Sequence, residues 1–462
     1  MENERRLLLK NIFKAYDIRG TYPDALNESI AGKIGSSFVQ LLKARRIVIG
    51  RDMRLSSPSL GKAFIEGARA AGASVTDLGR TTTPMLYYAI IDGKFDGGAM
   101  VTASHLPGQF NGFKLCREKA IPLSGDQGLP AIEQLVREDS PSQKDNSLKG
   151  AYEESSILDR YIDRLNQFVH NPGPLKFVAD AGNGMGGIDV PLLVKRFPVW
   201  KLTSLYFKPD GRFPHHIANP LLPSTTVELQ ARVLKEHADF GVAFDGDADR
   251  CGFIDEKGER IPEDLITALI GEFLLTKKPG STILYDLRSS RIVPETITRF
   301  GGKAVRCRVG HAFIKAQMRE ENALFAGELS GHYYYRDMGF TDNGIFTMIQ
   351  MLNLLSLKGA PLSRLVQPLK KYHATGEVNL RVKAKDAVFH ALEAAYKTAE
   401  KDHLDGLTLE FGDWWFNLRS SNTEPVIRLN LEANQEETMK KKEKEVLQII
   451  HAADPSMTIK ED

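Results

Sequence analysis

The stretch IVIGRDMRLSSP at residues 47–58 passes from an apolar run into a polar loop and ends on a proline. Proline is common at the first position of a helix, and Ser57 before it is the expected N-cap. The segment that follows has apolar residues at helical spacing and reaches Gly72, a typical helix end. These apolar residues are Leu60, Phe64, Ile65, Ala68 and Ala71. The stretch therefore predicts a strand, a loop and a helix, the repeating unit of α/β proteins.

The same pattern occurs twice more along the chain. KFVADAGNGMGG at 176–187 and TILYDLRSSR at 282–291 are again apolar runs that end in Asp and a polar loop. A second series of short apolar runs enters loops dense in reactive groups, in AMVTASH at 99–105, FGVAFDGDADR at 240–250 and ALFAGELSGH at 323–332. We interpret the two series as three homologous α/β domains, each with one chemical loop at the carboxyl ends of its strands.

The pattern changes after about residue 370. The expected elements there are a helix over 388–402, strands at 407–411, 414–418 and 426–431, and a last helix over about 436–452. This order predicts an α+β domain. The expected domains are residues 1–150, 151–254, 255–368 and 369–462, arranged around a central cleft.

Composition excludes several classes of protein. The 462 residues contain 61 Lys+Arg and 59 Asp+Glu, so no net charge favours nucleic acid or a lipid surface. The widely spaced Cys116, Cys251 and Cys307 form neither a disulfide framework nor a zinc pattern, which indicates a reducing compartment. The first residues lack a signal peptide's apolar stretch, and the apolar run 265–275 contains Glu272 and is too short to span a bilayer. We expect a cytoplasmic protein without nucleic-acid or membrane partners.

The DGDAD loop alternates Asp245, Asp247 and Asp249 with small residues. Three carboxylates at one point repel one another unless a hard divalent cation binds, so the loop predicts a metal site. An EF-hand is disfavoured, because its sixth position needs Gly and is Arg250 here. A haloacid-dehalogenase-type phosphotransferase stays an alternative, although such enzymes have Thr or Val where this chain has Asp249.

The loop TASHLPGQFNGFK at 102–114 contains Ser104 without the G-x-S-x-G pattern of hydrolases. His105 is its direct neighbour, and successive side chains of an extended segment point to opposite sides, so a simple Ser–His dyad is not expected. His105 and Lys114 suggest a serine that carries a phosphoryl group whose charge is held by cations.

Two further loops contain groups suited to sugar phosphates. GELSGH at 327–332 presents Glu328, Ser330 and His332, which can accept from and donate to sugar hydroxyls. RSSNTEPVIR at 419–428 has the components of a phosphate cradle. These components are Arg419, Ser421, Asn422, Thr423 and Arg428.

The four loops, in this order, closely resemble those of the α-D-phosphohexomutase family, in particular the bacterial phosphomannomutase/phosphoglucomutase enzymes. The resemblance covers essentially the whole chain, from KAYDIRG at 14–20 to the last domain. TASH and DGDADR are its most specific motifs.

The resemblance implies a phosphorylated Ser104 in the resting enzyme and Mg²⁺ bound by that phosphate together with Asp245, Asp247 and Asp249. It also implies that hexose 1-phosphate and hexose 6-phosphate, of mannose or glucose, interconvert through a hexose 1,6-bisphosphate. Glucose 1,6-bisphosphate or mannose 1,6-bisphosphate would then be the activator.

Residue roles follow from the same resemblance. His105, Lys114 and Arg250 would offset the phosphoryl charge, and Lys114 and His332 are candidates for general acid and base. The implied substrate-binding residues are Tyr16, Arg19, Arg288, His311, Glu328, Ser330, Arg419, Ser421, Asn422, Thr423 and Arg428. The family default is a monomer, and we expect the last domain to close over the substrate as a lid.

Two positions depart from the family pattern. Leu106 stands where Asn is usual, and Arg288 stands where several relatives have Lys. GELSGH differs only at Leu329 from the GEMSGH of dual mannose/glucose enzymes, whereas phosphoglucosamine mutases have GEQSGH. A phosphoglucosamine mutase and a sugar-phosphate-binding regulator with little catalysis are therefore kept as alternatives.

Overall fold

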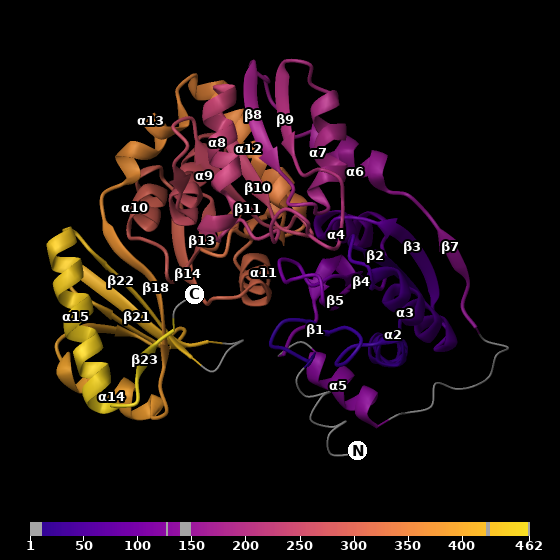
Figure 1. Ribbon diagram of the computed structural model, residues 1–462, viewed down its shortest axis with the longest axis horizontal. Coiled ribbons are helices and arrows are strands. Elements are labelled where there is room, and N and C mark those ends of the chain that lie inside the picture. Colours follow the sequence, from indigo (N-terminus) through magenta and orange to yellow (C-terminus); the bar gives the residue numbers. More distant parts are fainter. Residues whose placement is uncertain (1–11, 126–127, 139–148, 422–425, 461–462) are drawn as a thin grey trace.

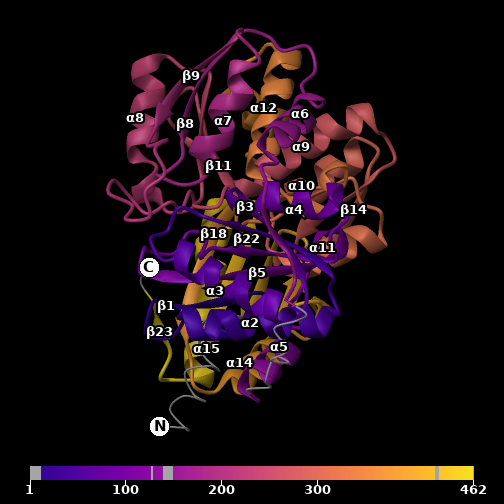
Figure 2. The same cartoon turned by 90° about the vertical axis from the view of Figure 1, so that its right-hand side faces the viewer.

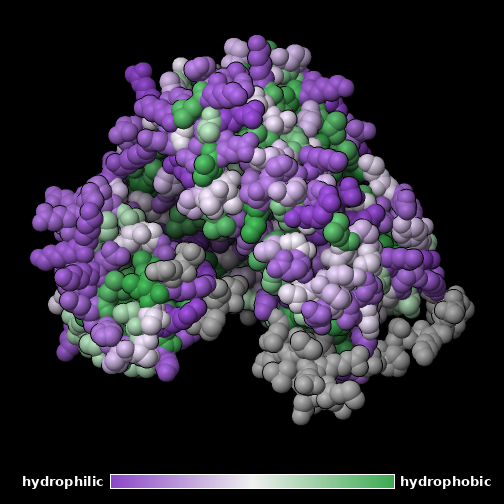
Figure 3. Space-filling view, viewed as in Figure 1, coloured by the Kyte–Doolittle hydropathy of each residue, from purple (hydrophilic) through white to green (hydrophobic). Residues whose placement is uncertain are grey.

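The protein was analysed as a computed structural model that describes residues 12–125, 128–138, 149–421 and 426–460. Four sheets follow one another in an arc, with the first domain and the fourth at opposite ends (Figure 1). The space-filling view shows the molecule hollowed between these two domains (Figure 3). The predicted fold class, three α/β domains and a last domain with an antiparallel sheet, is confirmed.

The first sheet has the strand order β1-β5-β4-β2-β3-β7, with β6 paired to β5. Its strands β2, β3, β4 and β7 are parallel, and β1 and β5 are antiparallel to their neighbours. The elements are β1 (Ile18–Thr21), α2 (Glu28–Leu42), β2 (Arg46–Arg51), α3 (Ser57–Ala70), β3 (Ser74–Arg80), α4 (Thr83–Asp92), β4 (Gly97–Val101), β5 (Phe110–Arg117), η1 (Glu118–Ala120), β6 (Ile121–Pro122), α5 (Leu129–Arg137) and β7 (Tyr152–Glu154). Strand β7 lies just after the predicted boundary at residue 150, and it belongs to this first sheet.

The second sheet has the order β12-β11-β10-β8-β9, and Figure 2 shows helices α7 and α8 flanking it. The elements are α6 (Leu158–Asn166), β8 (Leu175–Asp180), α7 (Gly186–Lys195), β9 (Trp200–Leu205), η3 (Pro223–Thr225), α8 (Val227–Glu236), β10 (Phe240–Phe244), β11 (Cys251–Asp255) and β12 (Arg260–Ile261).

The third sheet has the order β14-β13-β15-β16-β17. The elements are α9 (Glu263–Lys277), β13 (Thr282–Asp286), α10 (Ile292–Arg299), β14 (Lys303–Cys307), α11 (His311–Glu320), β15 (Phe325–Gly327), β16 (Tyr333–Tyr335), η4 (Arg336–Met338), β17 (Thr341–Asp342), α12 (Gly344–Lys358), α13 (Leu362–Val366) and η5 (Gln367–Leu369). The orders β5-β4-β2-β3, β11-β10-β8-β9 and β16-β15-β13-β14 are equivalent, so the three domains repeat one topology.

The repeat extends to an aspartate at the end of each central strand. Its carboxylate accepts the backbone N–H of the residue two positions later, in the pairs Asp52–Arg54 at 3.0 Å, Asp180–Gly182 at 2.7 Å and Asp286–Arg288 at 2.8 Å. In the first and third domains that residue is an arginine whose guanidinium also pairs with the aspartate. In the second domain His216 pairs with Asp180 at 3.0 Å instead. The loops that the sequence singled out are thus anchored in the same way three times.

One expectation about a helix start was wrong. The N-cap of α3 is Ser56, not Ser57. The reason is that the Ser57 hydroxyl donates to the Asp52 carboxylate at 2.6 Å, so it stabilises the loop before the helix.

The fourth sheet is antiparallel, with the order β19-β20-β21-β22-β18-β23. The elements are β18 (His373–Arg381), α14 (Lys385–Ala395), β19 (Glu400–Asp402), β20 (Leu407–Glu410), β21 (Trp414–Ser420), β22 (Ile427–Ala433), α15 (Glu436–Ala453) and β23 (Thr458–Ile459). The helix expected over 388–402 ends earlier, and 400–402 form a strand. Tyr396 leaves helical geometry at this point and packs its ring against Phe411 and Trp414.

The first three domains share a buried apolar cluster, whereas the fourth domain does not take part in it. One buried cluster runs from α4 of the first domain through the second domain to α9 and α12 of the third. The fourth domain has a core of its own. Its contacts with the third domain include ion pairs such as Arg306–Glu410 at 2.5 Å, so polar contacts help to hold it in place.

Among the described residues, no single helix is long and apolar enough to cross a bilayer. The bent pair Gly344–Lys358 and Leu362–Leu369 meets these criteria of length and composition together.

Candidate active site

Ser104 lies in the loop after β4 and is almost completely buried. Its φ of 51° places a non-glycine residue in the left-handed region, which is a strained conformation. The Ser104 hydroxyl donates to Asp245 Oδ2 at 2.6 Å and accepts from Arg250 Nη2 at 3.0 Å. The serine loop of the first domain and the aspartate loop of the second domain are therefore in direct contact at the Ser104 hydroxyl oxygen.

Close approach of these two loops depends on Gly246. A Cβ at that position would lie 2.4 Å from the Ser104 carbonyl oxygen, well inside van der Waals contact. Only glycine leaves room for the two backbones.

Arg54 positions the serine loop from behind. Its guanidinium is buried, and its five N–H groups all have acceptors at 2.5–3.0 Å. These acceptors are the Asp52 carboxylate and the carbonyl oxygens of Ser104, Leu106, Pro107 and Phe110. Arginine has no further donors, so a single side chain fixes the backbone that carries Ser104.

Asp245, Asp247 and Asp249 are buried, and one oxygen of each lies within 4.8 Å of the others. The Oδ1 atoms of Asp247 and Asp249 accept no hydrogen bond from any residue that the structure describes. Buried carboxylate oxygens without donors are costly unless a cation neutralises them. The three aspartates therefore form a candidate site for a hard divalent cation.

Two basic side chains offset part of this negative charge. Lys114 Nζ contacts Asp247 at 2.6 Å and also binds Asp249, and Arg250 Nε binds Asp245 at 3.1 Å. Burial opposes the charge on Lys114, but Asp247 and Asp249 outweigh it and raise the pKa of Lys114. Lys114 is thus held as an ammonium, which balances part of the negative charge of the aspartate loop.

The acidity of the aspartates differs because their neighbours differ. Burial, followed by the charges of Asp249 and Asp247, raises the pKa of Asp245. For Asp249, burial also favours the protonated form, yet Lys114 and then His332 hold its pKa well below the ordinary value. Of these two aspartates, Asp249, which contacts Lys114, therefore carries the more stable negative charge.

His105 is neutral, although the sequence suggested a cation at this position. Burial, and then the charge of Arg250, lower the pKa of His105 well below its ordinary value. Its Nδ1 accepts from Arg250 and lies 3.3 Å from the Ser104 hydroxyl. Arg250 is the group that places positive charge beside the serine.

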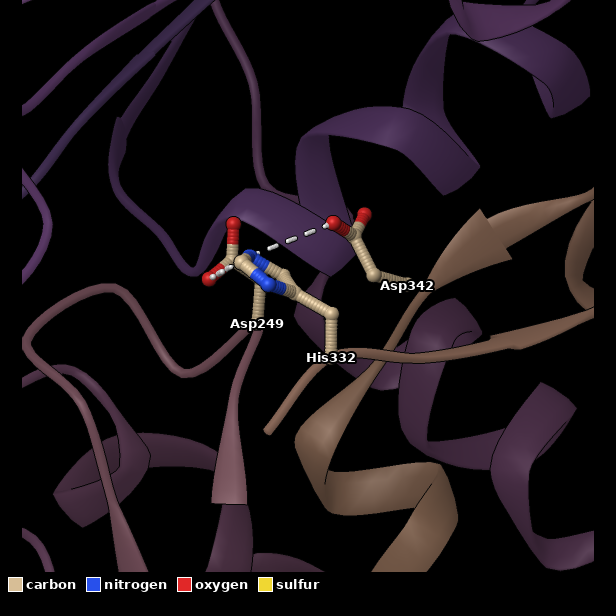
Figure 4. A group of neighbouring side chains, drawn as sticks. All are labelled: Asp249, His332 and Asp342. Atoms are coloured by element: carbon tan, nitrogen blue, oxygen red, sulfur yellow. Dashed lines mark ion pairs between the residues drawn. The ribbon is translucent and has the colours of Figure 1, made fainter. Parts of the chain in front are cut away.

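His332 lies between two carboxylates (Figure 4). Its Nε2 is 3.5 Å from Asp249 Oδ1 and 3.7 Å from Asp342 Oδ2, and its Nδ1 is 2.8 Å from the Ser330 hydroxyl. Asp342 is in turn paired with buried Lys315 at 2.8 Å. The imidazole is therefore oriented from both sides, close to the aspartate loop.

A second group of charged side chains lies where the third and fourth domains meet. Arg419 and Arg428 are direct partners across β21 and β22, and Arg288 reaches them from the loop after β13. We call Arg288, Arg419 and Arg428 the arginine cluster. Glu377 on β18 is within 3.1 Å of all three guanidiniums. Burial opposes the charge on Glu377, but Arg288 first, then Arg428 and Arg419, lower its pKa.

Glu328 links the two groups. Its carboxylate accepts from the Tyr334 hydroxyl at 2.7 Å, lies 3.6 Å from His332 Nδ1 and lies 3.8 Å from Arg288 Nη2. A carboxylate in this position can bind hydroxyl groups of a ligand that extends from Ser104 to the arginine cluster.

The remaining predicted residues lie around this path. The Tyr16 and His311 rings are 5.4 Å apart, and His311 is 6.3 Å from the ring of His332. Arg19 pairs with Asp17 at 2.7 Å. Ser421 directly follows β21, the strand that contains Arg419. Asn422 and Thr423 lie outside the described residues.

Several functional neighbours were not predicted. They are Asp52, Arg54, Thr83, Lys315, Asp342 and Glu377, and Thr83 donates to Asp247 at 2.6 Å. The repeated Asp-x-Arg at 52–54 and 286–288 is a signal that could have revealed Arg54. Thr83, Lys315, Asp342 and Glu377 have no comparable sequence signal, because their partners are distant in the chain.

The fold and the site define a phosphoryl-transfer enzyme: a buried serine beside a candidate cation site faces a cluster of guanidiniums across several domains. Comparison with known proteins gives the family. The phosphoglucomutase/phosphomannomutase alpha/beta/alpha domains I, II and III match residues 10–143, 159–258 and 262–372, and the C-terminal domain matches 377–449. The chain belongs to the phosphoglucomutase/phosphomannomutase family, which confirms the resemblance and excludes the haloacid-dehalogenase alternative.

Individual relatives agree with this family. A phosphomannomutase of Salmonella montevideo is 41% identical over 451 residues, which cover 95% of this chain and 99% of the relative. Phosphohexose mutases of Xanthomonas campestris pv. campestris are 41% identical over 428 residues, covering 91% and 94%. A phosphoglucomutase/phosphomannomutase family protein of Burkholderia thailandensis has a crystal structure with a TM-score of 0.90, 32% identity and coverage of 97% and 99%. A more distant structure, Aspergillus fumigatus N-acetylphosphoglucosamine mutase (TM-score 0.64, 13% identity, coverage of 98% and 99%), is a complex with GlcNAc-6P and magnesium.

Proposed function

We propose that the protein is a phosphohexose mutase of the phosphomannomutase type, which interconverts the 1-phosphate and 6-phosphate of mannose or glucose. The observation that carries this proposal is the Ser104 hydroxyl, 2.6 Å from Asp245 in the candidate cation site. The nearly full-length relatives named phosphomannomutase and phosphohexose mutases support the same reaction class.

The serine side of the site holds the reacting phosphate. Asp245, Asp247 and Asp249 would hold Mg²⁺, because their buried oxygens suit a hard cation, and the bound ion would offset charge on the transferring phosphoryl group. Arg250 donates to the Ser104 hydroxyl and is placed to donate to a phosphate on that oxygen. Lys114, as an ammonium paired with Asp247, adds positive charge on this side of the site, and its role as general acid or base stays a hypothesis of the family resemblance.

The other side holds the sugar and the phosphate that does not react. Glu328 accepts hydroxyl groups, His332 is oriented toward the reacting end, and the arginine cluster binds the distant phosphate. A hexose 1,6-bisphosphate, the activator and intermediate, would present one phosphate to each side in either direction. The monomeric state, the domain boundaries, the cytoplasmic location and closure of the last domain as a lid stay predictions.

The first test compares substrates. Initial rates are measured with Mg²⁺ and a trace of glucose 1,6-bisphosphate on glucose 1-phosphate, mannose 1-phosphate and glucosamine 1-phosphate. We expect turnover of the two neutral sugars and little of the amino sugar. A clear preference for glucosamine 1-phosphate would favour the phosphoglucosamine mutase alternative. Binding of all three without turnover would favour the regulator.

The second test concerns the residues. Ser104→Ala should lose nearly all turnover, and Asp247→Asn should lose both turnover and the dependence on Mg²⁺. Ser59→Ala is the matched control and should keep wild-type rates, because the Ser59 hydroxyl bonds to the Ser56 carbonyl and to Glu28, away from the groups that contact Ser104. Full activity of Ser104→Ala would falsify the nucleophile assignment.

A further inference from the structure

The carboxylate of Glu377 occupies the arginine cluster. Its Oε2 accepts from Arg288 Nη1 at 3.1 Å and from Arg419 Nη2 at 3.0 Å, and its Oε1 lies 2.9 Å from Arg428 Nη1. Three guanidiniums from two domains therefore converge on one carboxylate.

The register of the fourth sheet explains why an anion is needed there. Arg419 and Arg428 lie directly opposite each other on β21 and β22, and like charges in this arrangement destabilise a sheet. Glu377 pairs with Asn430 on β22, two residues from Arg428, so its side chain is within diagonal reach. In the absence of substrate, Glu377 supplies the anion that keeps these arginines together.

The same position is the one that a phosphate needs. The Nε and Nη2 atoms of Arg288 are already bound to Asp286, and its Nη1 points to Glu377 Oε2. Arg419 Nε is buried and has no hydrogen-bond partner among the described residues. A phosphate oxygen that bridges Arg288 and Arg419 would have to take the place of Oε2, because one oxygen position lies between the two donors.

We propose that Glu377 is an internal competitor for the substrate's distant phosphate. Its carboxylate binds the arginine cluster when no phosphate is present, leaves it when phosphate binds, and returns when phosphate dissociates. The proposal rests on the proposed function for the substrate, since that reaction requires the bisphosphate to release the cluster and rebind through its other phosphate. A resident carboxylate assists this release, because the arginines regain a partner as the phosphate leaves.

Glu377→Gln tests the proposal by removing the charge and keeping the shape. We expect the dissociation constant for inorganic phosphate, measured by titration calorimetry, to fall roughly five- to tenfold, because only a partly exposed ion pair is removed from the competition. In the mutase assay KM and kcat should both fall, since tighter binding slows release.

Glu410→Gln is the matched control. Glu410 is also a fourth-domain carboxylate that pairs with third-domain arginines, Arg306 at 2.5 Å and Arg291 at 3.8 Å. Its side chain is 28% exposed, close to the 25% of Glu377. It lies outside the arginine cluster, so its phosphate affinity and kinetics should match those of the wild type.

Unchanged or weaker phosphate binding by a folded Glu377→Gln protein would overturn the proposal. Loss of a competitor must strengthen phosphate binding, whereas loss of a residue that merely positions the arginines would weaken it. If that variant does not fold, the wild-type crystal structure with inorganic phosphate decides. Separation of Glu377 from Arg419 is expected, and a retained 3.0 Å contact beside bound phosphate refutes the competition. Neither measurement requires turnover, so an inactive wild-type protein would contradict the proposed function alone.

Discussion

Replacing Arg54 by Lys tests whether the serine loop depends on the guanidinium shape. The charge opposite Asp52 is kept, but a lysine has three N–H donors where the structure uses five. At least two buried acceptors therefore lose their donor. One of the acceptors at risk is the carbonyl of Ser104 itself, whose backbone is already strained.

The expected magnitude follows from this loss. Each buried acceptor without a partner costs about 1–3 kcal/mol, so the variant should be less stable by roughly 2–6 kcal/mol. A displacement of the Ser104 hydroxyl by about 1 Å should lower kcat on the order of 100-fold. Both effects arise although Arg54 is not expected to touch the substrate.

The assay combines urea unfolding, followed by circular dichroism, with initial mutase rates and the phosphate content of Ser104 by intact mass. Arg51→Lys is the control. Arg51 is the last residue of β2, just before the loop that contains Arg54, and it also pairs with an aspartate, Asp77, but its side chain is 28% exposed. Its loss of stability should stay below about 1 kcal/mol. An Arg54→Lys protein with wild-type stability and wild-type turnover would refute the role of Arg54 in holding the loop.

Three further perturbations have expected outcomes. Burial raises the pKa of Asp189 to about 7 from an ordinary 3.8, so the native state binds the proton more tightly and stability falls as pH rises from about 4 to about 7. Asp189→Asn should therefore be more stable than the wild type at pH 8, by up to about 4 kcal/mol in urea unfolding, with a smaller difference at pH 5. Gly246→Ala should lower turnover at least about tenfold, because its Cβ would meet the Ser104 carbonyl, whereas Gly412→Ala has open space and should not. Lys315→Met should cost about 3–5 kcal/mol by leaving Asp342 buried without its cation, and an unchanged thermal midpoint would contradict this.

The sequence was most informative where a residue's role depends on its neighbours in the chain. Strands ending in Asp and the alternation of the DGDAD loop are local patterns, so the repeated topology and the clustering of three aspartates in a candidate metal site could be predicted. The state of His105 could not, because its burial and its contact with Arg250, 145 residues away, arise only in the folded chain. Glu377 was missed for the same reason, since Arg288 is 89 residues distant.

Two predicted element boundaries were wrong because side-chain contacts in the folded chain override the local helix preference. The helix expected up to residue 402 ends at Ala395, because Tyr396 packs into an aromatic group with Phe411 and Trp414. Ser57 looked like a cap and instead donates to Asp52. In both cases the side chain contacts a residue outside the helix itself, and helical spacing and capping preferences do not reveal such a contact.

The two ends of the site differ in a way that suits a substrate with two phosphates. Around Ser104, three aspartates outnumber Lys114 and Arg250, so a cation is required before a phosphate can stay there. At the arginine cluster three guanidiniums face the carboxylates of Glu377 and Asp286, so the distant phosphate of the proposed reaction would need no cation there. In the proposed reaction a bisphosphate would place either phosphate at either end, and only the phosphate beside Ser104 would be next to the proposed nucleophile. In the proposed reaction the distant phosphate must leave the arginine cluster before the bisphosphate can rebind in the other orientation, and Glu377 is placed to take over its arginine partners.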